Sequence, residues 1–273
     1  MTNRPIKFTL LGLVTGVLLV LPGIWYAQAA TKAKPVLKVC ADHYPPFTIY
    51  DTPAGPPRGS IVEILETLAV HLEYDLTYTA NTPFRRCLSK LEQGEVDLMG
   101  GLLFSAERAK YLHLFPYLTS SKKSFYVRHD SLLEIRGLED LTGLTVGTTL
   151  GHKYFPAFDN SQGQFVKANA GHVKNSFQRL LAGRVDVVIA TERQAMFLIA
   201  DTPEFKGKFK TMPFSYSGEN RVYIGLSKRS PAAERSAEFA DVIEQLLADN
   251  TFEAISRAFY QRYFNEESSF ATP

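Results

Sequence analysis

One pattern occurs twice in this chain and constrains its fold more than any other feature. Residues 86–101 read RCLSKLEQGEVDLMGG, and residues 177–191 read FQRLLAGRVDVVIAT. Each segment begins with a stretch of helical apolar period that stops at a glycine, and Val-Asp and an apolar run follow at once. A helix that leads directly into a buried strand is half of an α/β crossover unit. The sequence therefore predicts an α/β protein with two similar lobes.

The two units also indicate where a ligand would bind. Their apolar runs end at Gly100-Gly101 and at Thr191. In open α/β sheets, the loops at the carboxyl ends of parallel strands form the ligand site. Because each lobe would offer one such edge, we expect a clamshell that holds its ligand between the lobes.

The first 29 residues have the composition of a secretory signal. Arg4 and Lys7 precede a mostly apolar run, and Ala27-Gln28-Ala29 fits the small-x-small rule for cleavage. We therefore predict a signal peptide over residues 1–29 that is removed after Ala29. The alternative is an uncleaved N-terminal anchor, although the apolar run is short for a membrane span.

The charge balance does not favour nucleic acid or a membrane surface as a partner. The chain has 30 Lys+Arg and 28 Asp+Glu, and the predicted signal removes two basic residues, which leaves 28 of each sign. A neutral balance offers no electrostatic footprint for a polyanion. The six histidines show no metal-ligand spacing. We expect no metal and no cofactor.

Two cysteines, Cys40 and Cys87, remain in the exported part of the chain. Oxidising conditions outside the cytoplasm favour a disulfide. Cys40 ends the first expected strand and Cys87 lies early in a nearby helix, so the two can meet. We predict a Cys40–Cys87 disulfide, and the alternative is a pair of buried thiols that act as small apolar residues.

A coarse assignment of elements sets the lobe boundaries. We expect lobe 1 to comprise residues 30–127 and 222–273, and lobe 2 to comprise residues 128–221. The strands at 124–128 and 221–227 would be the two crossovers, and two crossovers form a hinge that bends through small dihedral changes. The closing helices, near residues 233–248 and 251–263, are expected to pack back on lobe 1.

The order of the motifs resembles that of the family 3 extracellular solute-binding proteins, the periplasmic receptors of polar amino acid ABC importers. The similar segments span nearly all of the chain after residue 29, and they are Tyr44-Pro45-Pro46-Phe47, Gly94-Glu95-Val96-Asp97, Ser105-Ala106-Glu107-Arg108-Ala109-Lys110, Gly183-Arg184-Val185-Asp186 and Asp249-Asn250-Thr251-Phe252. The resemblance implies a type II periplasmic binding protein fold, with two α/β lobes joined by two hinge strands. It also implies a periplasmic monomer whose partner is an inner-membrane ABC permease or a sensor.

The resemblance assigns the ligand carboxylate to Arg108, because the arginine of the family's Glu-Arg pair has that role. The chemistry agrees, since a guanidinium is a planar fork of donors that fits a carboxylate and stays charged. A helix start at Ser105 would add backbone N–H groups nearby. The alternative is a surface arginine paired with Glu107.

Further ligand contacts are implied on both lobes. In lobe 1, Gly100, Gly101 and Leu103 would supply backbone contacts, and Tyr44 and Phe84 an aromatic platform, unless these rings only pack in the core. In lobe 2, the family uses a helix start, and here that turn carries His152 and Lys153. The alternative, which the sequence favours for His152, is an exposed loop residue. The full predicted ligand set is Arg108, Tyr44, Phe84, Gly100, Gly101, Leu103, His152, Lys153 and Thr191.

Thr191 departs from the family in a way that affects the ligand. Typical members have an aspartate there, which pairs with the ligand α-ammonium, and a threonine supplies no charge. Asp42 is one candidate to replace it. Arg85 and Arg86 add positive potential near Phe84, or else belong to a solvated face. These features favour an acid without a conventional α-amine, or one with a second acidic group.

We therefore predict a non-catalytic protein that captures a small carboxylate-bearing solute, an amino acid or a related organic acid, for an ABC importer. One alternative is a periplasmic dehydratase-like enzyme of the same fold that acts on a prephenate-like acid. That reaction would need a general acid, for which Glu63 and His152 are the candidates. Another alternative is a ligand-sensing receptor module that is not tied to transport.

Overall fold

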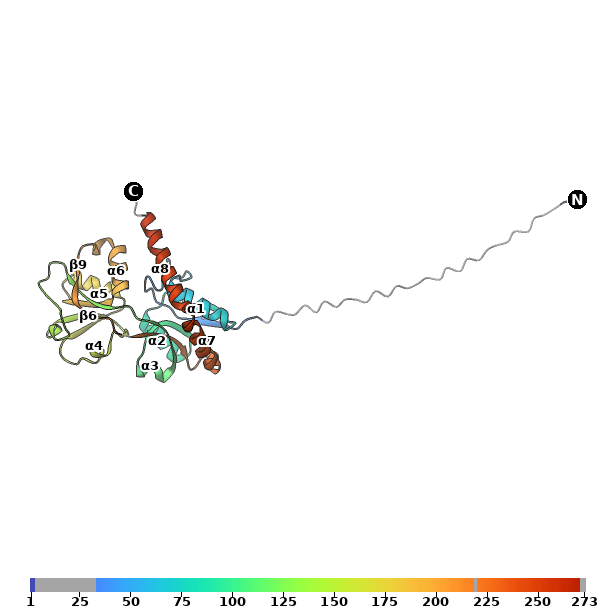
Figure 1. Cartoon of the computed structure of the whole chain (residues 1–273), viewed down its shortest axis with the longest axis horizontal. Helices are drawn as coiled ribbons and strands as arrows, with labels where there is room; N and C mark the ends of the chain where they lie inside the picture. The colour runs from blue at the N-terminus through green and yellow to red at the C-terminus, as the bar shows by residue number, and fades with distance from the viewer. Residues whose placement is uncertain (3–32, 219, 271–273) are drawn as a thin grey trace. The chain divides into compact units, whose positions relative to one another are not determined.

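The computed structural model describes residues 1–2, 33–218 and 220–270, with side chains as far as Tyr263. Residues from Lys34 onward form one compact unit that contains two five-stranded sheets with flanking helices (Figure 1). This arrangement confirms the predicted α/β architecture with two lobes. Apart from its first two residues, the predicted signal peptide lies outside the described residues.

The first sheet has the strand order β2-β1-β3-β10-β4. Strand β1 runs parallel to β2 and β3, whereas β10 runs antiparallel to β3 and β4. The strands are β1 (Val36–Val39), β2 (Asp75–Tyr78), β3 (Leu98–Leu103), β4 (Leu112–Thr119) and β10 (Arg221–Ser227). The helices of this lobe are α1 (Ser60–His71), α2 (Phe84–Gln93), α3 (Ala106–Tyr111), α7 (Ser236–Ala248) and α8 (Thr251–Phe270).

The second sheet repeats this arrangement, with the order β7-β6-β8-β5-β9. Strand β6 runs parallel to β7 and β8, and β5 runs antiparallel to β8 and β9. The strands are β5 (Lys123–Arg128), β6 (Thr145–Thr149), β7 (Val166–Ala170), β8 (Val187–Thr191) and β9 (Phe209–Tyr216), and the helices are α4 (Pro156–Asn160), α5 (Val173–Leu181) and α6 (Glu192–Asp201). Short 3-10 helices lie at Glu139–Leu141, Pro203–Phe205 and Pro231–Arg235.

The aspartate of the repeated sequence pattern has the same structural role in both lobes. Asp97 Oδ2 accepts a hydrogen bond from the backbone N–H of Lys38, at 2.7 Å. Asp186 Oδ2 accepts one from the N–H of Thr145, also at 2.7 Å. Each carboxylate thus fixes strand β1 or β6 beside the central strand of its sheet, β3 or β8, which follows the aspartate. The carboxyl ends of these strands are thereby aligned at one edge of each sheet.

Strand β5 belongs to the second sheet, which corrects the expected assignment of residues up to 127 to lobe 1. Residues 123–126 pair with β8, and β5 also pairs with β9. The chain therefore crosses from the first sheet to the second between Thr119 and Lys123. The physical reason is burial, because Phe125 and Val127 are fully enclosed in the second lobe, in contact with its apolar core.

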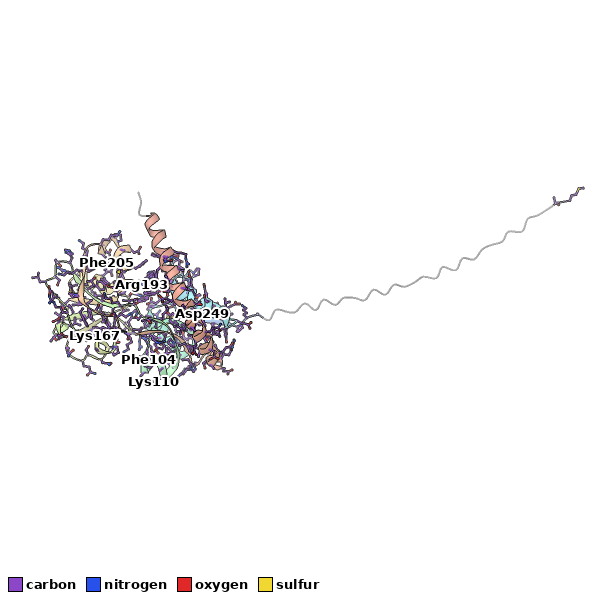
Figure 2. The ribbon with its side chains drawn as sticks, in the orientation of Figure 1. Phe104, Lys110, Lys167, Arg193, Phe205 and Asp249 are labelled. Atoms are coloured by element: carbon purple, nitrogen blue, oxygen red, sulfur yellow. A yellow bond between two sulfur atoms is a disulfide. The ribbon has the colours of Figure 1, made fainter. Side chains whose placement is uncertain are left out.

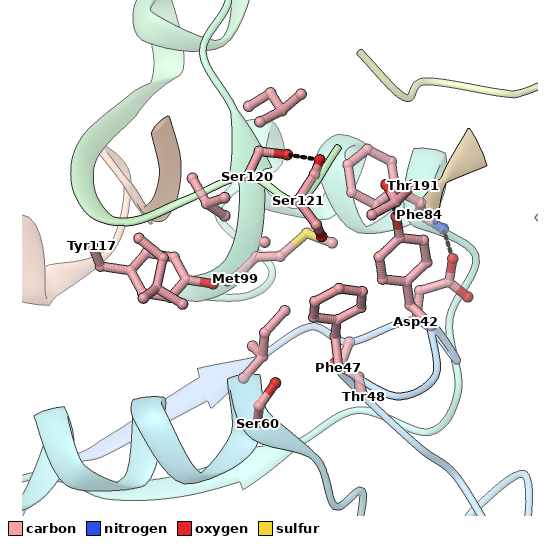
Figure 3. A pocket seen from close by; sticks show the side chains of 18 of the residues that line it. Asp42, Phe47, Thr48, Ser60, Phe84, Met99, Tyr117, Ser120, Ser121 and Thr191 are labelled. Carbon is pink, nitrogen blue, oxygen red and sulfur yellow. Dashed lines mark hydrogen bonds between the residues drawn. The ribbon is translucent and has the colours of Figure 1, made fainter. Parts of the chain in front are cut away.

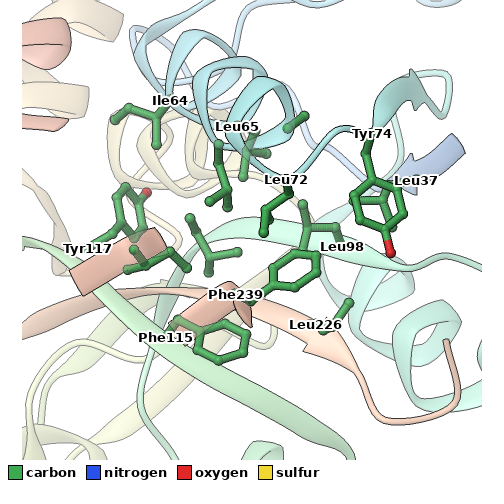
Figure 4. Close-up of a cluster of buried hydrophobic side chains, with 14 of the residues drawn as sticks. Leu37, Ile64, Leu65, Leu72, Tyr74, Leu98, Phe115, Tyr117, Leu226 and Phe239 are labelled. Carbon is green, nitrogen blue, oxygen red and sulfur yellow. The ribbon is translucent and has the colours of Figure 1, made fainter. Parts of the chain in front are cut away.

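The core of the first lobe lies between its sheet and helices α1, α7 and α8 (Figure 4). Leu65 from α1, Leu98 from β3 and Phe239 from α7 are all buried there. Helix α8 adds Phe252, so the two closing helices pack on the first lobe. Burial of each such side chain contributes about 1.5–3 kcal/mol. In the second lobe, the fully buried Phe205 (Figure 2) belongs to a separate cluster.

Candidate functional site

A cavity of about 370 Å³ lies where the edges of the two sheets meet (Figure 3). The structure brings every predicted ligand-binding residue to its wall, because the carboxyl ends of parallel strands in both lobes face the same space. These lining residues are Tyr44, Phe84, Gly100, Gly101, Leu103, Arg108, His152, Lys153 and Thr191.

Arg108 is buried in the wall of the cavity, with 3% of its surface exposed. It lies on α3, whose start is capped by Ser105, since Ser105 Oγ accepts a hydrogen bond from the Arg108 N–H at 3.2 Å. Its guanidinium donates to the carbonyl of Leu103 and, at 2.8 Å, to the carbonyl of Gly151 in the second lobe. Burial lowers the pKa of Arg108 from its ordinary value. Arg108 is therefore not a surface arginine paired with Glu107.

A buried lysine that the sequence analysis did not identify stands beside Thr191. Lys123 is 5% exposed, and its Nζ donates to Thr191 Oγ1 at 2.8 Å. The hydroxyl of Tyr44, from the first lobe, also donates to Thr191 Oγ1 at 2.8 Å. Burial lowers the pKa of Lys123 to about 8.

The alternation of residues in β5 was the signal that could have revealed this lysine. Side chains two residues apart in a strand point to the same face. Lys123 therefore shares its face with Phe125 and Val127, which are fully buried. The expectation that residues 124–128 form a crossover placed Lys123 outside any sheet and hid this pattern.

His152 is half-buried and packs against aromatic rings, so its reading as an exposed loop residue is wrong. Its ring meets Phe84 edge-on at a centroid distance of 4.5 Å and Tyr44 at 5.5 Å. Burial, together with the charges of Arg108 and Lys123, lowers the pKa of His152 to about 3. The imidazole is therefore neutral at neutral pH, and its buried Nε2 has no hydrogen-bond partner among the described residues.

Asp42 lines the cavity, and one of its two carboxylate oxygens already has a protein partner. Its Oδ2 accepts a hydrogen bond from the N–H of Phe84 at 3.2 Å, which is drawn in Figure 3. Its Oδ1 lies 3.4 Å from Nδ1 of His172 in the second lobe. Hydrogen bonding to Asp42 raises the pKa of His172, so this contact between the lobes becomes charged when His172 is protonated.

The other charged candidates lie away from the cavity. Arg85 and Arg86 are exposed and do not line it, so they form a solvated face. Glu63 forms an ion pair with Arg262 at 2.5 Å and does not line it either.

Positive charge predominates along the cavity wall. The cationic lining side chains are Arg108, Lys123, Lys153 and Arg193, and the anionic ones are Asp42 and Glu253. Arg193 lies over the ring of Tyr260, at 4.1 Å from its centroid. Fixed charges of one sign in a cleft with low-dielectric walls attract ligands of the opposite sign. The arrangement is suited to an anionic ligand.

A disulfide between Cys40 and Cys87 supports the first-lobe side of the site. It joins the end of β1 to α2, and both cysteines are buried. The loop that carries Tyr44 is thereby tied to the helix that carries Phe84. Within the described part of the chain, no group of three or more His, Cys, Asp and Glu side chains could hold a metal ion. None of the described helices has both the length and the apolar character that a membrane span needs.

Comparison with known proteins identifies similar chains. The model of the bacterial extracellular solute-binding proteins, family 3, matches residues 37–265. A Vibrio harveyi protein named as an amino-acid ABC transporter-binding protein is 26% identical over 237 residues, which cover 84% of this chain and 88% of the relative.

Solved structures agree on the fold. An ancestral arginine-binding protein bound to arginine has a TM-score of 0.68 at 22% identity, covering 84% of this chain and 99% of that one. A histidine kinase sensor domain with similarity to periplasmic binding proteins has a TM-score of 0.69 at 21% identity, covering 83% of this chain and 96% of that one. These matches confirm the expected type II architecture of two lobes.

Proposed function

Because the chain belongs to the bacterial extracellular solute-binding proteins of family 3, we propose that its cavity captures a small carboxylate-bearing solute, an amino acid or a related organic acid, for an ABC importer. Capture takes place in the periplasm after removal of residues 1–29. The loaded form then docks as a monomer on an inner-membrane permease, or on a sensor.

The state of Arg108 carries this proposal. Its guanidinium is nearly fully buried, and no carboxylate of the described residues lies within ion-pair distance of it. A guanidinium has five N–H donors, and two carbonyls accept only part of them. A buried charge without a counterion is unfavourable, so an anionic ligand would supply what the protein does not. A carboxylate fits the remaining fork.

Contacts between the lobes support a mechanism of closure around the solute. Arg108 reaches Gly151, Tyr44 reaches Thr191, and Asp42 pairs with His172. The first residue of each pair belongs to lobe 1 and the second to lobe 2. In hinge closure, such contacts form as the cleft shuts. A solute that touches both walls would favour the closed form, which is the form that a permease can distinguish from the empty one.

We also propose that binding occurs without chemistry. A dehydratase would need a general acid in the cavity, and the two candidates lack the required properties. Glu63 is outside the cavity and paired with Arg262. His152 is held neutral by burial and by two neighbouring cations.

Thermal unfolding of the protein without residues 1–29 tests the proposal. Each amino acid is compared with its des-amino acid and with dicarboxylates, because a ligand that binds only the folded state raises Tm by mass action. Arg108→Lys is expected to weaken binding of the best acid by about 10- to 100-fold, the value of hydrogen bonds to a charged group. Arg86→Lys, on the exposed face, is the matched control and should bind normally. If no acid raises Tm, or if Arg108→Lys binds as well as the parent, the proposal is wrong.

A further inference from the structure

We infer that Lys123, Thr191 and Tyr44 form a second anion-binding subsite, and that the solute is a small dicarboxylic acid with one carboxylate at Arg108 and the other at Lys123. This inference rests on the proposed function, because it concerns the same cavity. It specifies the class of solute and excludes recognition of an α-ammonium at this subsite.

The hydrogen-bond inventory of the subsite favours an acceptor. A lysine ammonium has three donors and no acceptor, and Lys123 uses one of them, on Thr191. The hydroxyl of Tyr44 donates its hydrogen to Thr191 Oγ1, so the hydroxyl hydrogen of Thr191 remains free. Two N–H groups and one O–H group are thus left over. A ligand carboxylate supplies the lone pairs that they lack, whereas a ligand ammonium only brings more donors.

The charges around Lys123 also favour a ligand carboxylate at this subsite. No carboxylate of the described residues lies within ion-pair distance of Lys123. Asp159, whose charge acts on Lys123, lies beyond ion-pair distance and accepts hydrogen bonds from the N–H of Tyr154. Asp42, in the cavity wall, accepts from the N–H of Phe84 and lies beside His172. A buried cation without a partner is strongly unfavourable, and a ligand ammonium at this place would add repulsion between like charges. A carboxylate would neutralise Lys123 as it binds.

The fold places the two cations on opposite walls. Arg108 lies on α3 of the first lobe, and Lys123 lies on β5 of the second sheet, directly opposite Thr191 in the strand pairing. Both side chains line the same cavity of about 370 Å³, and the charges of both act on the ring of His152. One short diacid can therefore contact both walls, with its carbon chain beside the rings of Phe84 and Tyr44. Each lobe would hold one end of the solute.

Calorimetric titration with matched ligands tests this inference. Succinate, glutarate and adipate are each compared with their monoamides, which have nearly the same shape but one negative charge fewer. The best diacid should bind at least about 30-fold more tightly than its monoamide, the low end for losing one partner of a buried charge pair. Lys123→Met should remove this difference by weakening the diacid and leaving the monoamide nearly unchanged.

Lys122→Met is the matched control, because Lys122 is the adjacent residue, is partly exposed, pairs with Glu192 and does not line the cavity. It should keep the preference for the diacid. The melting temperature of each unliganded variant reports folding, and Lys123→Gln provides a second substitution with a polar side chain.

The results separate this inference from the proposed function. Equal binding of diacid and monoamide by the parent protein overturns the inference alone, and so does a Lys123→Met variant that weakens both ligands equally. Tighter binding of a monocarboxylic amino acid than of any diacid also overturns it. If no acid of any kind binds the parent protein, the proposed function fails as well.

Discussion

Replacing Lys123 by methionine should stabilise the unliganded protein at neutral pH, although it should impair binding of a diacid. Lys123 is buried with one hydrogen bond and no carboxylate within ion-pair distance among the described residues. A methionine fills a similar volume with no charge to desolvate. The unliganded protein would thus contain an unfavourable buried charge that the ligand neutralises, and functional sites often reduce stability in this way.

The magnitude follows from the pKa of Lys123, which burial lowers from 10.5 to about 8. One pKa unit corresponds to about 1.4 kcal/mol, so protonated Lys123 costs the folded state about 3 kcal/mol at pH 7. Loss of the hydrogen bond to Thr191 offsets about 1 kcal/mol of this. The free energy of unfolding of Lys123→Met should therefore exceed that of the parent by about 2 kcal/mol at pH 7.

The pH dependence has a definite sign. Below pH 8, the lysine is protonated in both states, and the full cost is present. Between pH 8 and pH 10.5, the unfolded chain binds a proton that the folded protein has released, so the stability of the parent rises with pH. The advantage of the variant should therefore shrink through this range and disappear by about pH 10.5.

Urea denaturation followed by far-UV circular dichroism measures both quantities, and circular dichroism is suitable because the single tryptophan, Trp25, lies in the predicted signal peptide. Subtracting the free energy of unfolding of the parent from that of the variant at each pH removes the contributions of the other titrating groups. Lys122→Met, which removes a partly exposed charge, should change stability by at most about 1 kcal/mol, without this pH dependence. A Lys123→Met variant that is less stable than the parent at pH 7, or whose stability difference does not change with pH, would refute the reasoning.

Two further predictions concern closure and the cavity wall. Contact with Asp42 raises the pKa of His172, so the contact between the lobes is charged at low pH and loses its charge as the pH rises through the raised pKa of His172. Ligand affinity, measured by calorimetry between about pH 6 and 8, should therefore fall as the pH rises. The variant His172→Gln should show a flatter dependence of affinity on pH in this range. An unchanged profile in the variant would contradict this role. Gly101→Ala adds a methyl group 2.9 Å from Ile61 at a φ of 79°, whereas the methyl group of Gly143→Ala meets nothing within 4 Å at a φ of 78°. Both variants should lose about 1 kcal/mol of stability, but only Gly101→Ala should also weaken ligand binding. Equal ligand affinities of the two variants would show that the cavity wall at Gly101 is not in contact with the ligand.

The sequence predicted those parts of the fold and site that depend on local patterns. The helix period, the glycine stops and the repeated Val-Asp predicted two equivalent lobes, and Asp97 and Asp186 do make equivalent backbone contacts. The rule that ligand sites lie at the carboxyl ends of parallel strands is also local. The resemblance to the family implied the ligand-binding residues, and all of them line one cavity, although their contacts with a ligand stay a prediction.

The features that the sequence did not reveal depend on contacts between distant segments. Asp42 accepts a hydrogen bond from Phe84 and lies 3.4 Å from His172, and both residues are remote from it in sequence. His152 could be read as exposed until the rings of Tyr44 and Phe84 were seen to cover it. A residue's exposure is set by what packs against it, and no local pattern states that.

The sequence by itself determined that this chain has two α/β lobes with a binding edge on each, because periodicity and turn chemistry act between neighbours along the chain. Only the tertiary structure decided the charge of the cavity. Lys123 and Thr191 lie 68 residues apart and meet because β5 pairs with β8. That pairing is selected by burial of Phe125 and Val127 in the second core, a cooperative gain from many distant contacts. It places a second cation opposite Arg108, where the sequence had shown only an uncharged threonine.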